Sequence, residues 1–313
     1  MSERSDVGGT GERAKRRGDA PVSAQQLGFD GMPTKLIKVT PSKLGTWTSC
    51  RRRYRMTYLD RPAPSRGGAW AHSTLGAVVH AALRSFFDQP PAARTADDAR
   101  RQVIKAWSAV SENSGFADAA QAARYRERAQ DWVGAYVDEL DGTAAEIDPV
   151  GLERWVAAPV GTIVAEGRVD RIDTRRNAEA PDGHELVVVD YKTGRRAPGT
   201  DDARGSQALA LYVLATRRTL RKPCRRVELH HLPSGEVAAF DHTPESLARH
   251  LQRAEEAAEE IVLASDTLTA GGDPDLLFPP SPGPQCSWCD LRRHCPVGMA
   301  AAPQLNPWAG LAP

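Results

Sequence analysis

The sequence of 313 residues is 41% hydrophobic and 26% charged, and its formal net charge at pH 7 is +1. These values are typical of a soluble globular protein with one large or two ordinary domains, and the near-neutral charge excludes a global electrostatic attraction to nucleic acid. No stretch of about 18 apolar residues is present, and no apolar segment follows the first basic residues, which argues against a transmembrane helix and a secretory signal. We therefore expect a cytoplasmic protein that does not bind a membrane.

The chain is expected to divide into a tail, one large domain and a short second tail. Residues 1–33 are rich in Gly, Ser, Arg and Asp and have no hydrophobic period, which predicts a disordered tail. The domain is expected over residues 34–300, with a helical arm at about 90–145 and a catalytic core at about 150–265. Residues 301–313 are expected to form a C-terminal tail.

A helix is predicted to begin after Thr40, which offers an N-cap, with Pro41 at the first helical position. Residues 51–59 follow, where four arginines are interleaved with Tyr54 and Tyr58. Two interpretations of this segment stay open. The guanidinium groups and rings could bind phosphates and bases, or the segment could be a helix with both tyrosines in the core and its arginines in water.

Residues 73–87 form the next predicted helix, with apolar side chains along one face. Gly76 and His80 are four residues apart and therefore lie on the same side, where the glycine permits the close approach of another backbone segment. A single helical histidine is more often structural than a ligand, so these two residues alone assign no chemistry.

Three neighbouring antiparallel strands are predicted at residues 152–156, 162–173 and 185–194. The third has a continuous apolar run before Asp190, which is typical of a strand buried on both faces. Asp190 and Lys192 are two positions apart and therefore share one face, and Asp170 is expected at the same level on the preceding strand. The acid and the lysine alone fit a strand-end salt bridge as well as a metal site with an adjacent charge stabiliser.

Residues 206–263 are expected to complete the core. An apolar helix is predicted at 206–215, a hairpin at 227–240 and an amphipathic helix at 245–263. The apolar helix must pack on the sheet to bury its side chains.

The five cysteines, an odd number in a chain with no export signal, favour metal ligation or free thiols over disulfides. Cys286 and Cys289 form a CxxC motif, and Cys295 follows six residues later, which is typical of a metal site. A fourth ligand is needed, and Cys50 is the natural candidate, which leaves Cys224 over. Four thiolates are compatible with either zinc or an iron–sulfur cluster.

Taken together, these motifs resemble the PD-(D/E)XK nuclease superfamily, and within it the RecB-like, AddB-type branch that carries an iron–sulfur cluster. The likeness extends over roughly residues 36–296. The matching segments appear in family order: the segment with Cys50, Gly76-x-x-x-His80, the strand with Asp170, the (D/E)xK form Asp190-Tyr191-Lys192, and the trio Cys286, Cys289 and Cys295. One feature departs from the family: Gln207 and Tyr212 are five apart rather than four, which leaves a role for Gln207 in doubt.

The resemblance implies an α/β fold with a PD-(D/E)XK restriction-endonuclease-like core, that is, a mixed central sheet flanked by helices, with a helical insertion. It implies that an iron–sulfur clasp joins the N- and C-terminal segments through a 4Fe-4S cluster on Cys50, Cys286, Cys289 and Cys295, with zinc less favoured. It further implies that Mg²⁺ or Mn²⁺ is held by His80, Asp170, Asp190 and the Tyr191 carbonyl, and that Lys192 and Tyr212 join the two acids in catalysis.

The function implied by this resemblance is a metal-dependent DNA nuclease, an exonuclease on single-stranded or end-bearing DNA in repair or recombination. The chain has no GxxxxGK[ST] phosphate loop, so any unwinding of DNA must come from a partner such as a helicase or another repair protein. The alternative is a catalytically inactive DNA-binding or partner-docking module that retains the fold. A ferredoxin-like redox protein is a weaker third reading, because Cys50 is so distant from the trio.

Overall fold

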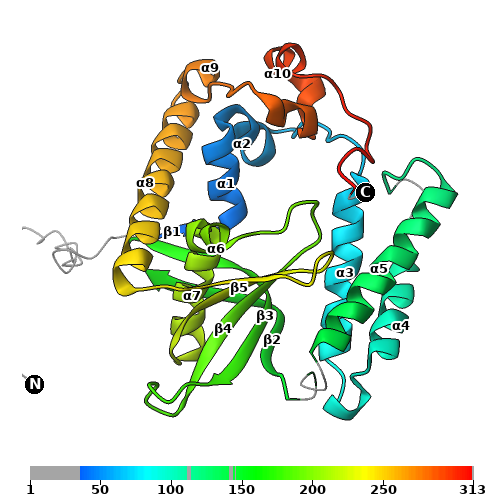
Figure 1. Ribbon diagram of the computed structural model, residues 1–313. Coiled ribbons are helices and arrows are strands. Elements are labelled where there is room, and N and C mark those ends of the chain that lie inside the picture. The colour runs from blue at the N-terminus through cyan, green and yellow to red at the C-terminus, as the bar shows by residue number, and fades with distance from the viewer. Residues whose placement is uncertain (1–35, 111–113, 141–143, 145, 312–313) are drawn as a thin grey trace, which may run out of the picture. The chain divides into compact units, whose positions relative to one another are not determined.

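The computed structural model describes residues 36–110, 114–140, 144 and 146–311, so the predicted disordered tail lies outside the described residues. Its centre is a mixed sheet of six strands in the order β1-β3-β4-β5-β6, with β2 also paired to β3 (Figure 1). The β1–β3 and β4–β5 pairs are parallel, and the other pairs are antiparallel. The strands are β1 (Ile37–Val39), β2 (Asp148–Val160), β3 (Ile163–Arg176), β4 (His184–Lys192), β5 (Cys224–His231) and β6 (Val237–Asp241).

Helices cover both faces of the sheet, which confirms the predicted α/β arrangement (Figure 1). Strand β4 is buried on both faces, because Leu186 and Val188 belong to one hydrophobic core and Val187 and Val189 to a second. The first core is closed by α1 (Pro41–Ser49), α2 (Arg51–Tyr58), α7 (Gln207–Leu220) and α8 (Pro244–Thr269). The second is closed by α3 (Ala71–Phe87), α4 (Ala96–Trp107) and α5 (Ala119–Glu139).

Two antiparallel pairs of the sheet, β2–β3 and β5–β6, are hairpins whose turns contain a glycine. The turn between β2 and β3 has Gly161 at φ +54°, and the turn between β5 and β6 has Gly235 at φ +72°, a left-handed conformation that glycine adopts without a steric penalty. Gly161 lies between the strands predicted at 152–156 and 162–173, and Gly235 lies within the hairpin predicted at 227–240. As expected, β2, β3 and β4 are neighbouring antiparallel strands.

The contacts of the arginine-rich helix α2 support the structural interpretation in part, because Tyr54 lies in the core but the arginines form ion pairs instead of facing water alone. Tyr54 is buried, and it contacts the ring of Trp47 edge to face. Arg51, Arg52 and Arg53 pair with carboxylates of later segments, respectively Glu260 at 2.6 Å, Asp275 at 2.8 Å and Asp290 at 3.1 Å. These arginines therefore tie α2 to α8 and to the C-terminal segments.

The C-terminal part consists of short elements: α9 (Pro274–Leu277), two 3₁₀ turns (Pro284–Trp288 and Arg292–His294) and α10 (Pro296–Ala301). The following residues continue to make contacts with the domain. Arg195 donates hydrogen bonds to the carbonyl groups of Ala309 and Leu311, at 2.9 and 2.7 Å, and Leu311 is buried in the second core. Another short helix, α6 (Thr200–Gly205), precedes α7, and a 3₁₀ turn (Pro91–Ala93) precedes α4.

No helix within the described residues is both long enough and apolar enough to span a lipid bilayer.

Candidate active site

The two predicted acids meet on adjacent strands. Arg171 of β3 is the register partner of Val189 of β4, so continuing the antiparallel register by one residue sets Asp170 opposite Asp190. The backbone N–H of Tyr191 donates to Oδ2 of Asp170 at 3.0 Å, which fixes the carboxylate against β4. The predicted level match of the acids is therefore present.

His80 reaches the same point from helix α3. Its Nδ1 lies 3.3 Å from Oδ2 of Asp170, and its Nε2 lies 3.2 Å from the carbonyl oxygen of Tyr191. One turn earlier, a Cβ at Gly76 would lie only 3.2 Å from Oγ1 of Thr193. The glycine thus lets α3 approach the end of β4, although the close neighbour is a side chain rather than the expected backbone.

Sequence reasoning missed a third acid, Glu153 of β2. Its Oε1 lies 3.8 Å from Nδ1 of His80, and one ligand atom each from His80, Glu153 and Asp170 lie within 4.8 Å of one another. Glu153 has φ +46°, a strained conformation for a residue with a side chain. The flanking pairs Leu152–Arg171 and Arg154–Val169 set it opposite Asp170. An acid inside a strand just after Gly151 was the only sequence signal.

The carboxylates around His80 favour a positive charge at its imidazole. Burial lowers the pKa of His80, but hydrogen bonds to Asp170 and Glu153 and the charges of Asp170 and Asp190 outweigh it and raise this pKa to about 10. Burial is also the largest cause that raises the pKa of Asp190, with Lys192 opposing it and Asp170 adding to it. Lys192 and Asp190 form a close ion pair, as the salt-bridge interpretation predicts, while their role at a metal site stays a prediction.

His80, Glu153 and Asp170 form part of the wall of a cleft of about 740 Å³. Tyr212 of α7 also lines it, and a Cβ at Gly167 would lie 2.6 Å from the Tyr212 ring. Burial, with the charges of Asp190 and Asp170, raises the pKa of Tyr212 to about 12, so its hydroxyl is protonated at neutral pH. Gln207, whose role the sequence left in doubt, is not among the residues that line the cleft.

The donor set fits a divalent cation. Two carboxylates, a carbonyl and an imidazole converge within a small volume, and oxygen-rich sites of this kind suit Mg²⁺ or Mn²⁺. His80 would have to release the proton that these carboxylates favour before its imidazole could bind a metal ion. Asp190 lies opposite Asp170 and adds a further carboxylate beside this group, with its Oδ2 paired to the Lys192 ammonium.

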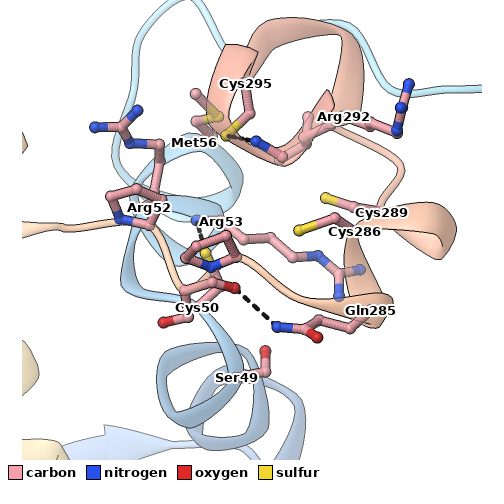
Figure 2. A pocket seen from close by; sticks show the side chains of 15 residues that line it. Ser49, Cys50, Arg52, Arg53, Met56, Gln285, Cys286, Cys289, Arg292 and Cys295 are labelled. Carbon is pink, nitrogen blue, oxygen red and sulfur yellow. Dashed lines mark hydrogen bonds between the residues drawn. The ribbon is translucent and has the colours of Figure 1, made fainter. Parts of the chain in front are cut away.

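The four predicted cluster cysteines line one cavity of about 70 Å³, and Figure 2 shows Cys286 and Cys289 side by side, with Cys295 and Cys50 on two other parts of the wall. The backbone N–H groups of Arg53 and Gly298 donate to the sulfur atoms of Cys50 and Cys295, at 3.5 and 3.4 Å. No three sulfur atoms of the described cysteines lie within 4.8 Å of one another, whereas the bond length of about 2.3 Å in a tetrahedral zinc site would draw them closer. The cavity gathers the thiols without forming a compact group.

A family model supports these observations. The model of the PD-(D/E)XK nuclease superfamily matches residues 38–296, and this chain belongs to that superfamily. Among solved structures, the chain is similar to a protein from Eubacterium rectale named as a candidate exonuclease, with 10% sequence identity and a TM-score of 0.46 over 82% of this chain and 88% of that one. A search of curated proteins finds no match.

Proposed function

We propose that this protein is a divalent-metal-dependent DNA nuclease of the RecB-like branch. The observation that carries the proposal is the convergence of His80, Glu153 and Asp170, beside the Asp190–Lys192 pair, on the wall of an open cleft. A binding module would have no chemical reason to gather three acids, an imidazole and an ammonium at one point. This set therefore favours catalysis over the alternative of an inactive DNA-binding or partner-docking module.

The proposed cation ligands are His80, Asp170, Asp190 and the Tyr191 carbonyl, with Glu153 as an additional carboxylate. The imidazole makes Mn²⁺ at least as suitable as Mg²⁺. When bound, the ion would polarise a phosphoryl oxygen and lower the pKa of a water molecule.

Lys192, Tyr212 and Arg171 are proposed to stabilise charge on the substrate or to hold the site residues in position. Lys192 carries an ammonium beside Asp190, where it can stabilise negative charge that develops on the phosphate in the transition state. Tyr212 offers a neutral hydroxyl as a hydrogen-bond donor on the same cleft. The guanidinium of Arg171 donates a hydrogen bond to the Tyr191 hydroxyl at 2.7 Å. This bond helps to fix β4, the strand that carries Asp190 and Lys192.

A 4Fe-4S cluster on Cys50, Cys286, Cys289 and Cys295 is the second part of the proposal. The N–H groups directed at two of the sulfurs, and the arginines that line the cavity (Arg52, Arg53 and Arg292), fit a set of negatively charged thiolates. Bound there, a cluster would join α2 to the C-terminal segment across a very long loop, where a cross-link restricts the unfolded chain most.

The substrate is proposed to be DNA with a free end, and the role to be in repair or recombination with a helicase or another repair protein as partner. The test is cleavage of 5′-labelled linear single-stranded DNA with Mn²⁺ or Mg²⁺, with EDTA as the control and a circular single strand as the comparison. Metal-dependent degradation of the linear strand alone supports an exonuclease. Binding of both strands without cleavage under any divalent metal supports the inactive module.

A further inference from the structure

Trp155 of β2 is a cleft residue that the catalytic proposal does not use. Its side chain is 57% exposed, and it lines the same cleft as His80 and Asp170. All seven tryptophans of the chain lie within the described residues, and only Trp288 among the others is exposed, where it contacts the rings of Trp70 and His72. None of the ring contacts among the described residues includes Trp155. Its indole face is therefore open to a ligand.

The position of Trp155 relates it directly to the cation site. Trp155 follows Glu153 by two residues along β2, a distance of about 6.8 Å in an extended strand. It is the register partner of Arg168 on β3, so the two side chains project from the same face of the hairpin. A group held against the indole would thus lie roughly one nucleotide from a phosphate held at Glu153 and Asp170.

Two cations that line the same cleft as Trp155 indicate the chemistry of that ligand. Arg168 is 66% exposed in the cleft and lies 2.8 Å from Glu153. Arg84, one turn after His80 on α3, lines the same cleft and has no ion-pair partner among the described residues. Guanidinium groups bind phosphates, while an exposed indole stacks on a nucleobase without regard to its sequence. Together they match a polynucleotide whose base is exposed.

We propose that Trp155 is a stacking platform for the base next to the scissile phosphate, with Arg84 and Arg168 binding the flanking phosphates. This inference rests on the proposed nuclease function and deepens it. A base can lie flat on the indole only when it is unpaired and unstacked, so Trp155 is the residue that makes the cleft prefer a single strand to a duplex.

The test measures binding without cleavage. The full chain carrying Asp190→Ala is titrated, in EDTA, into a short 5′-labelled oligo(dT) and into the same strand with abasic residues in place of its central thymidines, and fluorescence anisotropy reports affinity. Trp155→Ala should weaken binding of oligo(dT) by about 5- to 150-fold, the equivalent of the roughly 1–3 kcal/mol of one stacked base. It should leave the affinity for the abasic strand unchanged.

Two further variants complete the experiment. Trp155→Phe keeps an aromatic face and should retain most of the affinity for oligo(dT). Leu263→Ala removes another exposed apolar side chain, on α8 and outside the cleft, and should change neither affinity.

The outcomes are separable from those of the nuclease assay, because no cleavage is required. An equal loss of affinity for both strands in Trp155→Ala, or no loss for either, would overturn the stacking role. Failure of the Asp190→Ala chain to bind oligo(dT) would overturn it as well. A selective loss for oligo(dT) in a chain that never cleaves DNA would support the stacking role and contradict only the proposed nuclease activity.

Discussion

The backbone N–H of Tyr191 donates a hydrogen bond of 3.0 Å to Oδ2 of Asp170, so the residue between Asp190 and Lys192 holds the acid of the neighbouring strand. The Tyr191 side chain points to the other face of the sheet, where its hydroxyl accepts from Arg171 at 2.7 Å. Arg171 also donates to the hydroxyl of Tyr136 on α5, at 3.2 Å. The helical arm is thus joined to the catalytic strands through one buried guanidinium.

Replacement of Arg171 should destabilise the fold. The Arg171 side chain is fully buried and lies 2.8 Å from Asp173, so Arg171→Met would leave that carboxylate buried with one cation fewer. We expect the free energy of unfolding to fall by about 3–5 kcal/mol, the usual cost of breaking a buried ion pair. Urea denaturation followed by circular dichroism measures it, with the exposed Arg101→Met as control. A loss no larger than that of the control would contradict the prediction.

Replacement of Glu153 should raise the Mn²⁺ concentration that cleavage requires. Glu153→Gln keeps the shape of the side chain and removes one negative charge from the group around His80. The Mn²⁺ concentration that gives half-maximal cleavage should rise at least about tenfold, because even outer-shell partners of metal ligands have effects of this size. Glu166→Gln, an acid of β3 outside this group, is the matched control. An unchanged Mn²⁺ requirement in Glu153→Gln would show that Glu153 has no part in holding the ion.

Glu228 should make stability depend on acid pH. Burial raises the pKa of this carboxyl, but hydrogen bonds from His230, Arg175 and Arg226 and the charge of Arg175 outweigh it and hold the pKa well below its usual range. A depressed pKa gives stability that is complete above the unfolded value of about 4.3 and is lost as pH falls through the folded value. Wild type should therefore exceed Glu228→Gln in unfolding free energy at pH 7, and the gap should narrow below about pH 4.

Urea denaturation at both pH values measures this gap, and Glu259→Gln, on the exposed side of α8, is the control. A gap that stays constant as pH falls would mean that Glu228 does not titrate in this way.

Cys286, a proposed cluster ligand, and the buried Cys224 should have different effects on the visible absorption of the protein. If a 4Fe-4S cluster is present, the purified protein should be brown, and Cys286→Ala should bleach its visible absorption while Cys224→Ala leaves it intact. Burial raises the pKa of Cys224 to about 12, so this thiol should also resist alkylation by iodoacetamide in the folded chain. A colourless protein that holds one zinc ion per chain would replace the cluster with a zinc site.

The parts of the site that could be predicted from sequence are those set by local order. The strand period fixes Asp190 and Lys192 on one face, and the antiparallel connection brings Asp170 level with Asp190. Glu153 could not be found this way, because the direction of its side chain depends on a positive φ inside β2. The alternation of polar and apolar residues does not predict such a backbone conformation.

Long-range pairing explains the other differences. The arginines of α2 were open to two interpretations because their carboxylate partners lie 209 to 237 residues later in the chain. The helical arm showed no chemistry in its sequence, since the role of Tyr136 depends on Arg171 and His230, which belong to distant strands. The spacing of the cysteine trio indicated a metal site by itself, whereas Cys50 was a candidate only because a fourth ligand was needed, since spacing carries no information about so distant a residue.

The central claim is that Asp190 and Lys192 serve catalysis rather than folding or DNA binding. The most direct measurement compares wild type, Asp190→Ala and Lys192→Ala for cleavage of linear single-stranded DNA in Mn²⁺, alongside affinity for the same strand and circular dichroism. We predict that both variants fold and bind DNA as wild type does and lose cleavage. Metal-dependent cleavage retained by both variants would contradict the assignment of this site.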